Sequence, residues 1–372
     1  MTTPHLFQPL TLRGLTLKNR VAVPPMCQYS AIDGRAGDWH LQHYGAMAAS
    51  GPGMIVIEAA GVVPDGRISP YCLSLHDDAT EAAFTRLVGA LKGFGGDSAI
   101  AVQLNHAGRK GGAARPWEGG GPAKSGGWST LSASDVPFDS GWPTPRAATA
   151  DDLAHLKQSF VDAAGRALRV GFDAIELHSA HGYLLHQFLS PLSNRRDDRY
   201  GGSLDNRMRF PLEVVEAVRA AWPADKPLGI RISATDWIDG GWTADESVVY
   251  AQAFKAAGID YVCVSSGGLA ANAKPPIGPG YQLPLARRIR HEVGIPTRAV
   301  GLIASPHQAE TALAEGDADM IAVGRGFLDN PRWVWHAAQA LGADIAYPPQ
   351  YMAALGRLWP GAALARSQAA AE

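Results

Sequence analysis

Hydrophobic and polar positions along the chain repeat one unit. A short run of Val, Ile, Leu and Ala is followed by a polar or glycine-containing corner and then by an amphipathic helical stretch. The unit occurs eight times, and its apolar runs are NRVAVPP (19–25), GMIVIEAA (53–60), AIAVQLNH (99–106), FDAIELHS (172–179), LGIRISA (228–234), DYVCVSS (260–266), PTRAVGL (296–302) and ADMIAVGR (318–325). Because each run is short and nearly continuous in apolar residues, it is typical of a parallel strand buried on both faces.

Helical stretches separate these runs, for example at residues 77–95, 149–171, 245–258 and 305–316. Most of them open with Asp, Ser or Thr and close at Gly, which are residues that cap helices. Eight alternations of strand and helix predict an α/β fold, a closed (β/α)8 TIM barrel, because an open doubly wound sheet usually stops at about five or six strands. We expect residues 1–372 to form a single domain of this kind.

Three segments lie outside the repeat. Residues 7–19 predict a β-hairpin that closes the amino-terminal mouth of the barrel. Residues 108–145, after the third strand, are rich in Gly, Pro, Ser and Trp and predict a long excursion that serves as a lid or pocket wall. Residues 345–372 form a C-terminal tail, whose last part, ARSQAAAE (365–372), is expected to be frayed.

Composition narrows the class of protein. Hydrophobic residues make up 46 % and charged residues 18 % of the chain, as in ordinary globular proteins. The net charge of -2 gives no basis for nucleic acid or an anionic membrane as the main partner, and the one basic run, NRRDDRYGG (194–202), is interleaved with acids.

Cysteine usage and the start of the chain suggest a compartment. Cys27, Cys72 and Cys263 are far apart and show neither CxxC spacing nor a His/Cys cluster of the zinc-binding kind. The first residues do not read as a signal peptide, and no apolar stretch approaches the roughly 18 residues that span a bilayer. We therefore expect a reduced, cytoplasmic protein.

Polar residues gather where the predicted strands end, which is where barrels of this kind carry their chemistry. His178 and His181 are three positions apart and would point to opposite faces if their strand continued. The chain must therefore turn near Ser179 for both imidazoles and Tyr183 to face one cavity. The other strand-end residues are Met26, Cys27, Glu58, Ala59, Gln103, His106, Arg231, Ser265, Ser266, Gly301, Gly324 and Arg325.

Three interpretations of His178, His181 and Tyr183 remain open at this point. The residues could simply pack in the core. The HxxH spacing could hold a metal, as in a metal-dependent TIM-barrel lyase or hydrolase, although no further ligand spacing supports this. We favour an electrophilic pocket in which two imidazoles hold a substrate oxygen that gains negative charge and the tyrosine donates a proton.

The ends of the seventh and eighth strands suggest a phosphate site. Gly301 in AVGL and Gly324 in AVGRGF permit close approach of the backbone, and Arg325 is a cation that could pair with a phosphate. Ordinary turn chemistry and a surface ion pair explain the same residues.

The chain resembles the flavin-dependent old yellow enzymes, and within them the branch of bacterial xenobiotic reductases and thermophilic-like ene-reductases. The segments that carry the resemblance cover nearly the whole chain: LFQPLTLRGLTLKNRVAVPPMCQYS (6–30), QLNHAGRK (103–110), GFDAIELHSAHGYLLHQFLSPLSNRRDDRYGGSLDNRMRF (171–210), IRISATDW (230–237), AVGLI (299–303) and AVGRGFLDNPRW (322–333).

The resemblance implies noncovalent FMN across the barrel mouth. Pro24, Pro25, Met26, Cys27, Ala59, Gln103 and Arg231 would surround its ring, and Gly301, Gly324 and Arg325 would hold its phosphate. Arg231 would stabilise the anionic reduced flavin. Cys27 would adjust the flavin potential, Tyr29 would contact substrate, and Lys110 would be a cation on the pocket side or the phosphate side.

The resemblance also implies an ene-reductase. His178 and His181 would bind the carbonyl or nitro oxygen of a small activated alkene, Tyr183 would protonate its α-carbon, and hydride would reach its β-carbon. Electrons would come from NADPH or NADH in ping-pong turnover, although the chain contains no GxGxxG motif. Related flavin barrels that carry an iron–sulfur cluster are disfavoured by three scattered cysteines, and a noncatalytic flavin-binding or ligand-binding barrel remains an alternative.

The tail departs from the pattern of this branch. Its members commonly end with Gln-Tyr and then an arginine that enters a neighbouring subunit's active site. Gln350 and Tyr351 match, but the next arginine is Arg357. Either Arg357 or Trp359 takes that place, or the contact is absent; we expect a homodimer or homotetramer.

Overall fold

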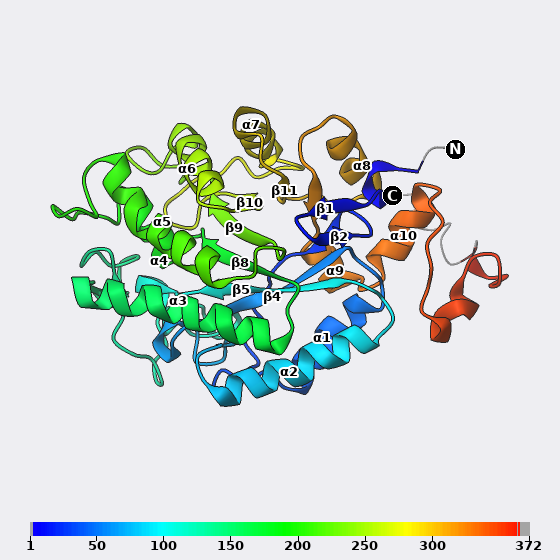
Figure 1. The fold of residues 1–372 in the computed structure, drawn as a ribbon, viewed down its shortest axis with the longest axis horizontal. Coiled ribbons are helices and arrows are strands. Elements are labelled where there is room, and N and C mark those ends of the chain that lie inside the picture. The colour runs from blue at the N-terminus through cyan, green and yellow to red at the C-terminus, as the bar shows by residue number, and fades with distance from the viewer. Residues whose placement is uncertain (1–2, 363, 365–372) are drawn as a thin grey trace.

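Eight parallel strands close into a barrel in the computed structural model, which describes residues 3–362 and 364 (Figure 1). Around the barrel the strands are β3 (Val21–Val23), β4 (Met54–Gly61), β5 (Ala99–Asn105), β8 (Ala174–Ser179), β9 (Leu228–Ser233), β10 (Tyr261–Ser265), β11 (Thr297–Ala299) and β12 (Met320–Ala322). Each coincides with one of the apolar runs, and only β4 extends beyond its run, by the single residue Gly61, so the predicted TIM barrel is confirmed.

Helices follow the strands and form the outer layer (Figure 1). They are α1 (Asp38–Ala48), α2 (Asp78–Gly93), α3 (Ala150–Val170), α4 (Leu184–Leu189), α5 (Leu204–Ala221), α6 (Ala244–Ala256), α7 (Leu283–Val293), α8 (Pro306–Ala314), α9 (Arg325–Asp329) and α10 (Trp333–Ala340). Asp77, Thr149 and Ser305 cap helices α2, α3 and α8, each by accepting a backbone N–H with its side chain. Gly171 ends α3 in the left-handed conformation with φ of 91°.

Alternation along the strands divides the core into two parts. One set of residues, such as Ile55, Ile100 and Ile175, packs in the main cluster with the helices. The alternate set forms a separate cluster inside the barrel, which includes Met54, Val56, Ala99, Ala101, Ala174, Tyr261 and Met320. This inner cluster begins at the first residues of five strands, so it fills the amino-terminal half of the barrel.

The predicted hairpin closes that end. Strands β1 (Leu10–Leu12) and β2 (Leu15–Leu17) pair antiparallel. Leu12 and Leu17 are buried in the inner cluster with the first residues of the barrel strands. The chemistry of the barrel is therefore left to its opposite, carboxyl end.

The excursion and the tail have little regular structure. Residues 108–145 contain the short helices η3 (Gly108–Lys110) and η4 (Pro116–Glu118) and the strand β6 (Leu131–Ser132), which pairs with β7 (Arg146–Ala147). The remaining short helices are η1 (His5–Phe7), η2 (Pro64–Gly66) and η5 (Pro349–Ala354). In the tail, Tyr347 stacks on Trp335 with ring centroids 4.1 Å apart. The predicted frayed end, 365–372, lies outside the described residues.

Candidate active site

The turn after β8 brings the two histidines together. The strand ends at Ser179, and the chain then reverses through His181 and Gly182, whose φ angles are 57° and 72°. As a result the ring centroids of His178 and His181 lie 5.3 Å apart, and those of His178 and Tyr183 lie 4.8 Å apart. The predicted turn near Ser179 thus places all three side chains in one group.

Buried groups from neighbouring elements hold this turn. Gly182 N–H donates to His186 Nδ1 over 2.9 Å, and Gln187 Nε2 donates to the Gly182 carbonyl over 2.6 Å. His186 Nε2 lies 3.0 Å from Asp236 Oδ1, and both side chains are fully buried. Hydrogen bonds therefore hold both the N–H and the carbonyl of Gly182, and they fix the turn.

Each histidine has one nitrogen engaged and one without a partner among the described residues. The Ala180 N–H donates to His178 Nδ1 over 3.3 Å, and His181 Nε2 lies 2.8 Å from Ser265 Oγ. His178 Nε2 and His181 Nδ1 are left for a ligand.

Both imidazoles are neutral at neutral pH. Burial lowers the pKa of His178 and of His181 well below the ordinary value, and the charges of Arg231 and Lys110 lower it further. A neutral imidazole carries one N–H, which it can donate to an oxygen. That hydrogen bond stabilises negative charge that develops on the oxygen.

Tyr183 lies beside the histidines at the start of α4. Burial raises the pKa of its phenol well above the ordinary value, and the nearby thiol of Cys27 raises it further, while Arg231 opposes the shift. The phenol therefore keeps its proton at neutral pH and can act as a proton donor.

Lys110 lies on the pocket side, where its Nζ is 5.2 Å from the centroid of the Tyr183 ring. The same Nζ donates to the carbonyls of His181 and Gly268 over 2.9 Å each. Burial and the neighbouring Arg109 lower the pKa of Lys110 to about 8. Lys110 thus ties the turn after β8 to the loop after β10.

The loop after β3 supplies Cys27 and Tyr29. Both pack, with Tyr183, against a small buried cluster that includes Ala59 and Cys72. Buried Glu58 holds this loop in place. The Gln28 N–H donates to Glu58 Oε2, and Glu58 Oε1 lies 2.9 Å from His40 Nε2. The register of the pairing between β4 and β5 shifts between Ile57 and Ala60, and this shift changes the direction of the side chains around Ala59.

A charged layer lies inside the barrel below the histidines. Gln103 Nε2 donates to Glu176 Oε1 over 2.8 Å, and Glu176 Oε2 pairs with Arg298, all three being buried. Because the side-chain amide nitrogen of Gln103 donates to Glu176, its side-chain carbonyl oxygen is left to accept a hydrogen bond from a ligand.

Arg231 stands next to His178 in the ladder of β8 and β9 and is 8 % exposed. No acidic side chain of the described residues pairs with it, and its Nε is buried without a partner. A buried, unpaired cation is costly, so this guanidinium calls for an anionic ligand.

The predicted phosphate residues are found at the ends of β11 and β12. Gly301 has a φ of 117°, and a Cβ there would lie 2.6 Å from Gln282 Nε2. Gly324 lies against Met26 and Pro24, to which a Cβ would come within 3.5 Å, and Pro25 follows in the half-buried segment that leads to Cys27. Arg325 is exposed at the start of α9 and has no ion-pair partner in the described part of the chain.

Sequence reasoning missed the residues that support the site. His186 with Asp236, His40 with Glu58, and Glu176 with Arg298 were not predicted as pairs. A signal was present for some of them, because Glu58, Glu176 and Arg298 are charged residues within otherwise apolar strands. Their partners lie far away in sequence, so the pairing itself had no local signal.

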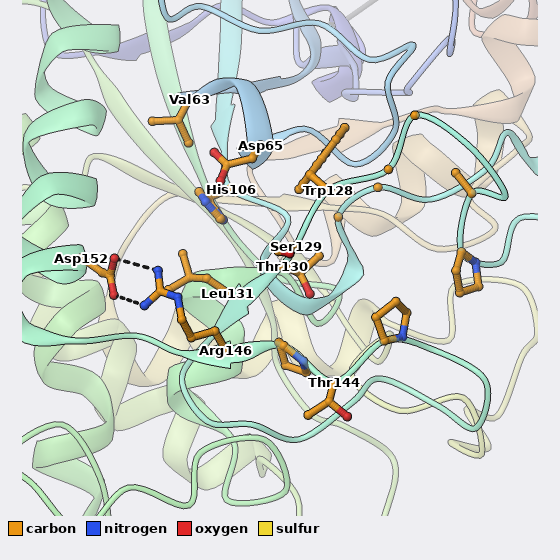
Figure 2. Close-up of a pocket in the computed structure, with 18 of the residues that line it drawn as sticks. Val63, Asp65, His106, Trp128, Ser129, Thr130, Leu131, Thr144, Arg146 and Asp152 are labelled. Atoms are coloured by element: carbon orange, nitrogen blue, oxygen red, sulfur yellow. Dashed lines mark hydrogen bonds and ion pairs between the residues drawn. The ribbon is translucent and has the colours of Figure 1, made fainter.

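The excursion lines a cavity of about 810 Å3, which is shown in Figure 2. Trp128, Thr130 and Leu131 line it together with Asp65 and His106, and Arg146 and Asp152 form an ion pair on its side. His178, His181 and Tyr183 do not line this cavity. It is therefore distinct from the group of residues at the barrel mouth.

A family model for the NADH:flavin oxidoreductase / NADH oxidase family matches residues 5–344. The chain belongs to this family. It is therefore an enzyme, a flavin-dependent oxidoreductase, and the resemblance to the old yellow enzymes is confirmed.

Relatives agree with this assignment. An NADPH dehydrogenase of Geobacillus thermodenitrificans is 47 % identical over 348 residues, which cover 93 % of this chain and 97 % of the relative. An NADPH dehydrogenase of Listeria innocua is 43 % identical over 348 residues, covering 93 % and 98 % of the two chains. The structure of morphinone reductase in complex with tetrahydroNAD is 30 % identical, with a TM-score of 0.74 and 93 % of each chain covered.

The metal-dependent alternative is not favoured, because the chain belongs to a family of flavin oxidoreductases. Within residues 3–362 and 364, no group of three or more His, Cys, Asp or Glu side chains is arranged to hold a metal ion. The helices of the same described residues also include none that is long and apolar enough to cross a membrane.

Proposed function

We propose that this flavin oxidoreductase is an FMN-dependent ene-reductase that reduces the C=C bond of small α,β-unsaturated carbonyl or nitro compounds with electrons from NADPH or NADH. One observation carries the proposal. Two neutral imidazoles, each with one nitrogen that has no partner among the described residues, lie beside a phenol that keeps its proton.

The residues at the barrel mouth fit FMN. Arg231 is a buried cation that lacks an acidic partner among the described residues, and Gln103 has a carbonyl oxygen left to accept from an imide N–H. Gly301, Gly324 and Arg325, at the ends of neighbouring strands, suit a phosphate. FMN held there would supply the hydride that the β-carbon of the alkene gains, with NAD(P)H as the source of the electrons.

The histidines hold the oxygen of the acceptor. As the alkene is reduced, negative charge develops on that carbonyl or nitro oxygen, and two N–H donors fixed in a dry site stabilise it. Removing one such donor in other enzymes costs roughly 3 to 4 kcal/mol of transition-state stabilisation. His178 Nε2 and His181 Nδ1 are the atoms available for this role.

Tyr183 supplies the proton for the α-carbon. Its raised pKa keeps the phenol protonated, and a carbanion is basic enough to take that proton. Tyr29 and Cys27, on the loop after β3, pack against the same cluster as Tyr183. We assign substrate contact to Tyr29 and adjustment of the flavin potential to Cys27.

The electron donor and the assembly belong to the same proposal. The bacterial relatives are NADPH dehydrogenases, and the structure of morphinone reductase contains tetrahydroNAD, which supports NAD(P)H as the donor. We place the enzyme in the cytoplasm, in keeping with three free cysteines. We also propose a homodimer or homotetramer, with the exposed Arg357 or Trp359 of the tail in contact with a neighbouring subunit.

Anaerobic turnover tests the proposal. Purified protein loaded with FMN should oxidise NADPH or NADH in step with the appearance of saturated product from cyclohexenone or maleimide. His178→Ala should lose alkene reduction, while His291→Ala, which removes an exposed histidine on α7, should not. Consumption of NADPH that leaves the alkene unreduced in the wild-type protein would refute it.

A further inference from the structure

Neutral His181 has two possible tautomers, and they give the site opposite properties. With the proton on Nδ1 the free nitrogen is a donor, and with the proton on Nε2 it is only an acceptor. Nε2 is engaged with Ser265 Oγ at 2.8 Å, and either atom of that pair can be the donor. The direction of this one hydrogen bond therefore decides what His181 presents to a substrate oxygen.

The surroundings of Ser265 decide the direction. Its hydroxyl has one alternative acceptor among the described residues, Gln282 Oε1, at the long distance of 3.4 Å. That oxygen already accepts from Ser266 Oγ over 2.6 Å. Gln282 cannot turn away, because its Nε2 donates to the Val300 carbonyl over 3.1 Å. Gln282 Oε1 has a second lone pair, but it lies 3.4 Å from Ser265 Oγ whereas His181 Nε2 lies 2.8 Å from it, so the shorter contact directs the proton of Ser265 to His181 Nε2.

We infer that Ser265, held in this orientation by Ser266 and Gln282, fixes the tautomer of His181 so that Nδ1–H faces the acceptor oxygen. Ser265 is a positioning residue, because it acts through His181. It is 4 % exposed at the end of β10. The inference rests on the proposed function and names a further residue that this function needs.

The tautomer of His178 is fixed by its own hydrogen bond. His178 Nδ1 accepts from the Ala180 N–H, so its single proton is on Nε2. Both rings then present an N–H at their free nitrogen. If His181 took the other tautomer, its lone pair would face an oxygen that is gaining negative charge, and one donor would be replaced by a repulsive contact.

Nitrogen NMR of protein labelled with 15N-histidine tests the tautomer directly. In the wild-type protein, His181 should show a protonated Nδ1 and an unprotonated Nε2, with its signals identified by their loss in His181→Gln. In Ser265→Ala the Nδ1–H form should fall to a mixture of tautomers, and Ser265→Thr, which keeps a hydroxyl, should restore it. A wild-type His181 protonated on Nε2 would overturn the inference.

Ser233 provides a matched control. Its hydroxyl accepts the backbone N–H of the same histidine over 2.9 Å and donates to the Gly267 carbonyl over 2.8 Å. Ser233→Ala should therefore leave the tautomer of His181 unchanged, since no ring atom is involved. A shift as large as that of Ser265→Ala would show that general loosening of the site, and not the hydroxyl at Nε2, sets the tautomer.

Phenol binding gives the functional readout. In FMN-loaded protein, Ser265→Ala should bind phenol about tenfold more weakly, while Ser265→Thr binds it nearly as well as the wild type. Unchanged phenol affinity in Ser265→Ala would contradict the inference even in an active ene-reductase. Absence of alkene reduction in the wild type would refute the proposed function and leave the NMR result standing.

Discussion

The surroundings of Tyr183 suit its phenol to one step, the donation of a proton. Its ring lies 4.8 Å from His178 and 5.2 Å from Lys110 Nζ, and burial raises its pKa well above the ordinary value. A phenol of this kind is a poor acid toward water and a sufficient one toward a carbanion. Its effect should therefore be confined to the half-reaction that creates a carbanion.

Tyr183→Phe should slow alkene reduction by about 10²-fold or more and leave flavin reduction by NADPH nearly unchanged, because only the first process needs the proton. Stopped-flow measurement of the two half-reactions checks this. Equal slowing of both halves would show that the phenol positions ligands rather than donating a proton.

Cys27→Ala should shift the flavin midpoint potential with FMN retained. The thiol lies on the loop after β3 and packs, as Tyr183 does, against the buried cluster that contains Ala59, where removal of a polarisable group changes the field at a bound ring. A spectroelectrochemical titration measures the shift, and Cys263→Ala is the control. An unchanged midpoint in Cys27→Ala would remove this role.

At the residue scale the sequence predicted that His178, His181 and Tyr183 lie together, but not which residues hold them in place. His178, His181 and Tyr183 lie within six positions, so their proximity follows from one turn. Ser265 is 84 positions from His181, and Asp236 is 50 positions from His186, so those contacts exist only after the barrel has closed.

The turn between β8 and α4 is the element on which the histidines depend. His181 and Gly182 both have positive φ, and Gly182 packs against the loop after β10. A Cβ on Gly182 would lie 2.4 Å from the Gly268 carbonyl oxygen and 2.8 Å from Leu269 Cα. Backbone atoms cannot move aside as a flexible side chain can, so only glycine fits.

Gly182→Ala should lower the free energy of unfolding by clearly more than the ~1 kcal/mol expected from positive φ alone, and it should weaken phenol binding. The matched control is Gly202→Ala, because Gly202 has a φ of 79° with open space around its Cβ position. Urea unfolding of both variants provides the comparison. Equal losses in the two would mean that the close approach to Gly268 has no energetic effect.

Elements with strong periodicity were predictable, and the short ones were less so. All eight strands were found from apolar runs, but β11 and β12 have three residues each where the runs suggested seven and eight. Both runs continue into glycine-containing turns, where apolar character no longer reports strand pairing. The excursion has no period to read, so η3, η4 and β6 could not be placed in advance.

At the scale of the whole molecule, the barrel is apolar at one end and polar at the other. Leucines of the hairpin and the first residues of the strands fill the amino-terminal half, and Gln103, Glu176 and Arg298 form a charged layer above them. Histidines and arginine follow at the carboxyl end. The fold therefore buries many titratable groups, and its stability should depend on pH.

Acid should destabilise the protein between about pH 6.5 and 4. Burial lowers the pKa of His43 and of His106 to about 4, whereas in the unfolded chain both titrate near the ordinary value of about 6.5. As pH falls through this window the unfolded state binds protons that the folded state does not, so folding loses free energy. The loss between pH 7 and pH 5 should be on the order of 2 kcal/mol for each histidine, or about 4 kcal/mol for the two together.

Urea unfolding of FMN-saturated protein at pH 7, 6 and 5 measures the effect. His43→Gln should reduce the slope with pH, while His291→Gln, at an exposed position, should not. A free energy of unfolding that is constant or rises toward pH 5 would contradict the assignment of neutral buried histidines.

The central claim is that the carboxyl end of the barrel holds a flavin beneath two imidazoles that bind an oxygen. The visible absorbance spectrum of the purified protein, recorded during titration with phenol, tests it most directly. We expect a yellow protein in which phenol produces a long-wavelength charge-transfer band that is lost in His178→Ala. A fully folded, colourless protein that takes up no added FMN would contradict it.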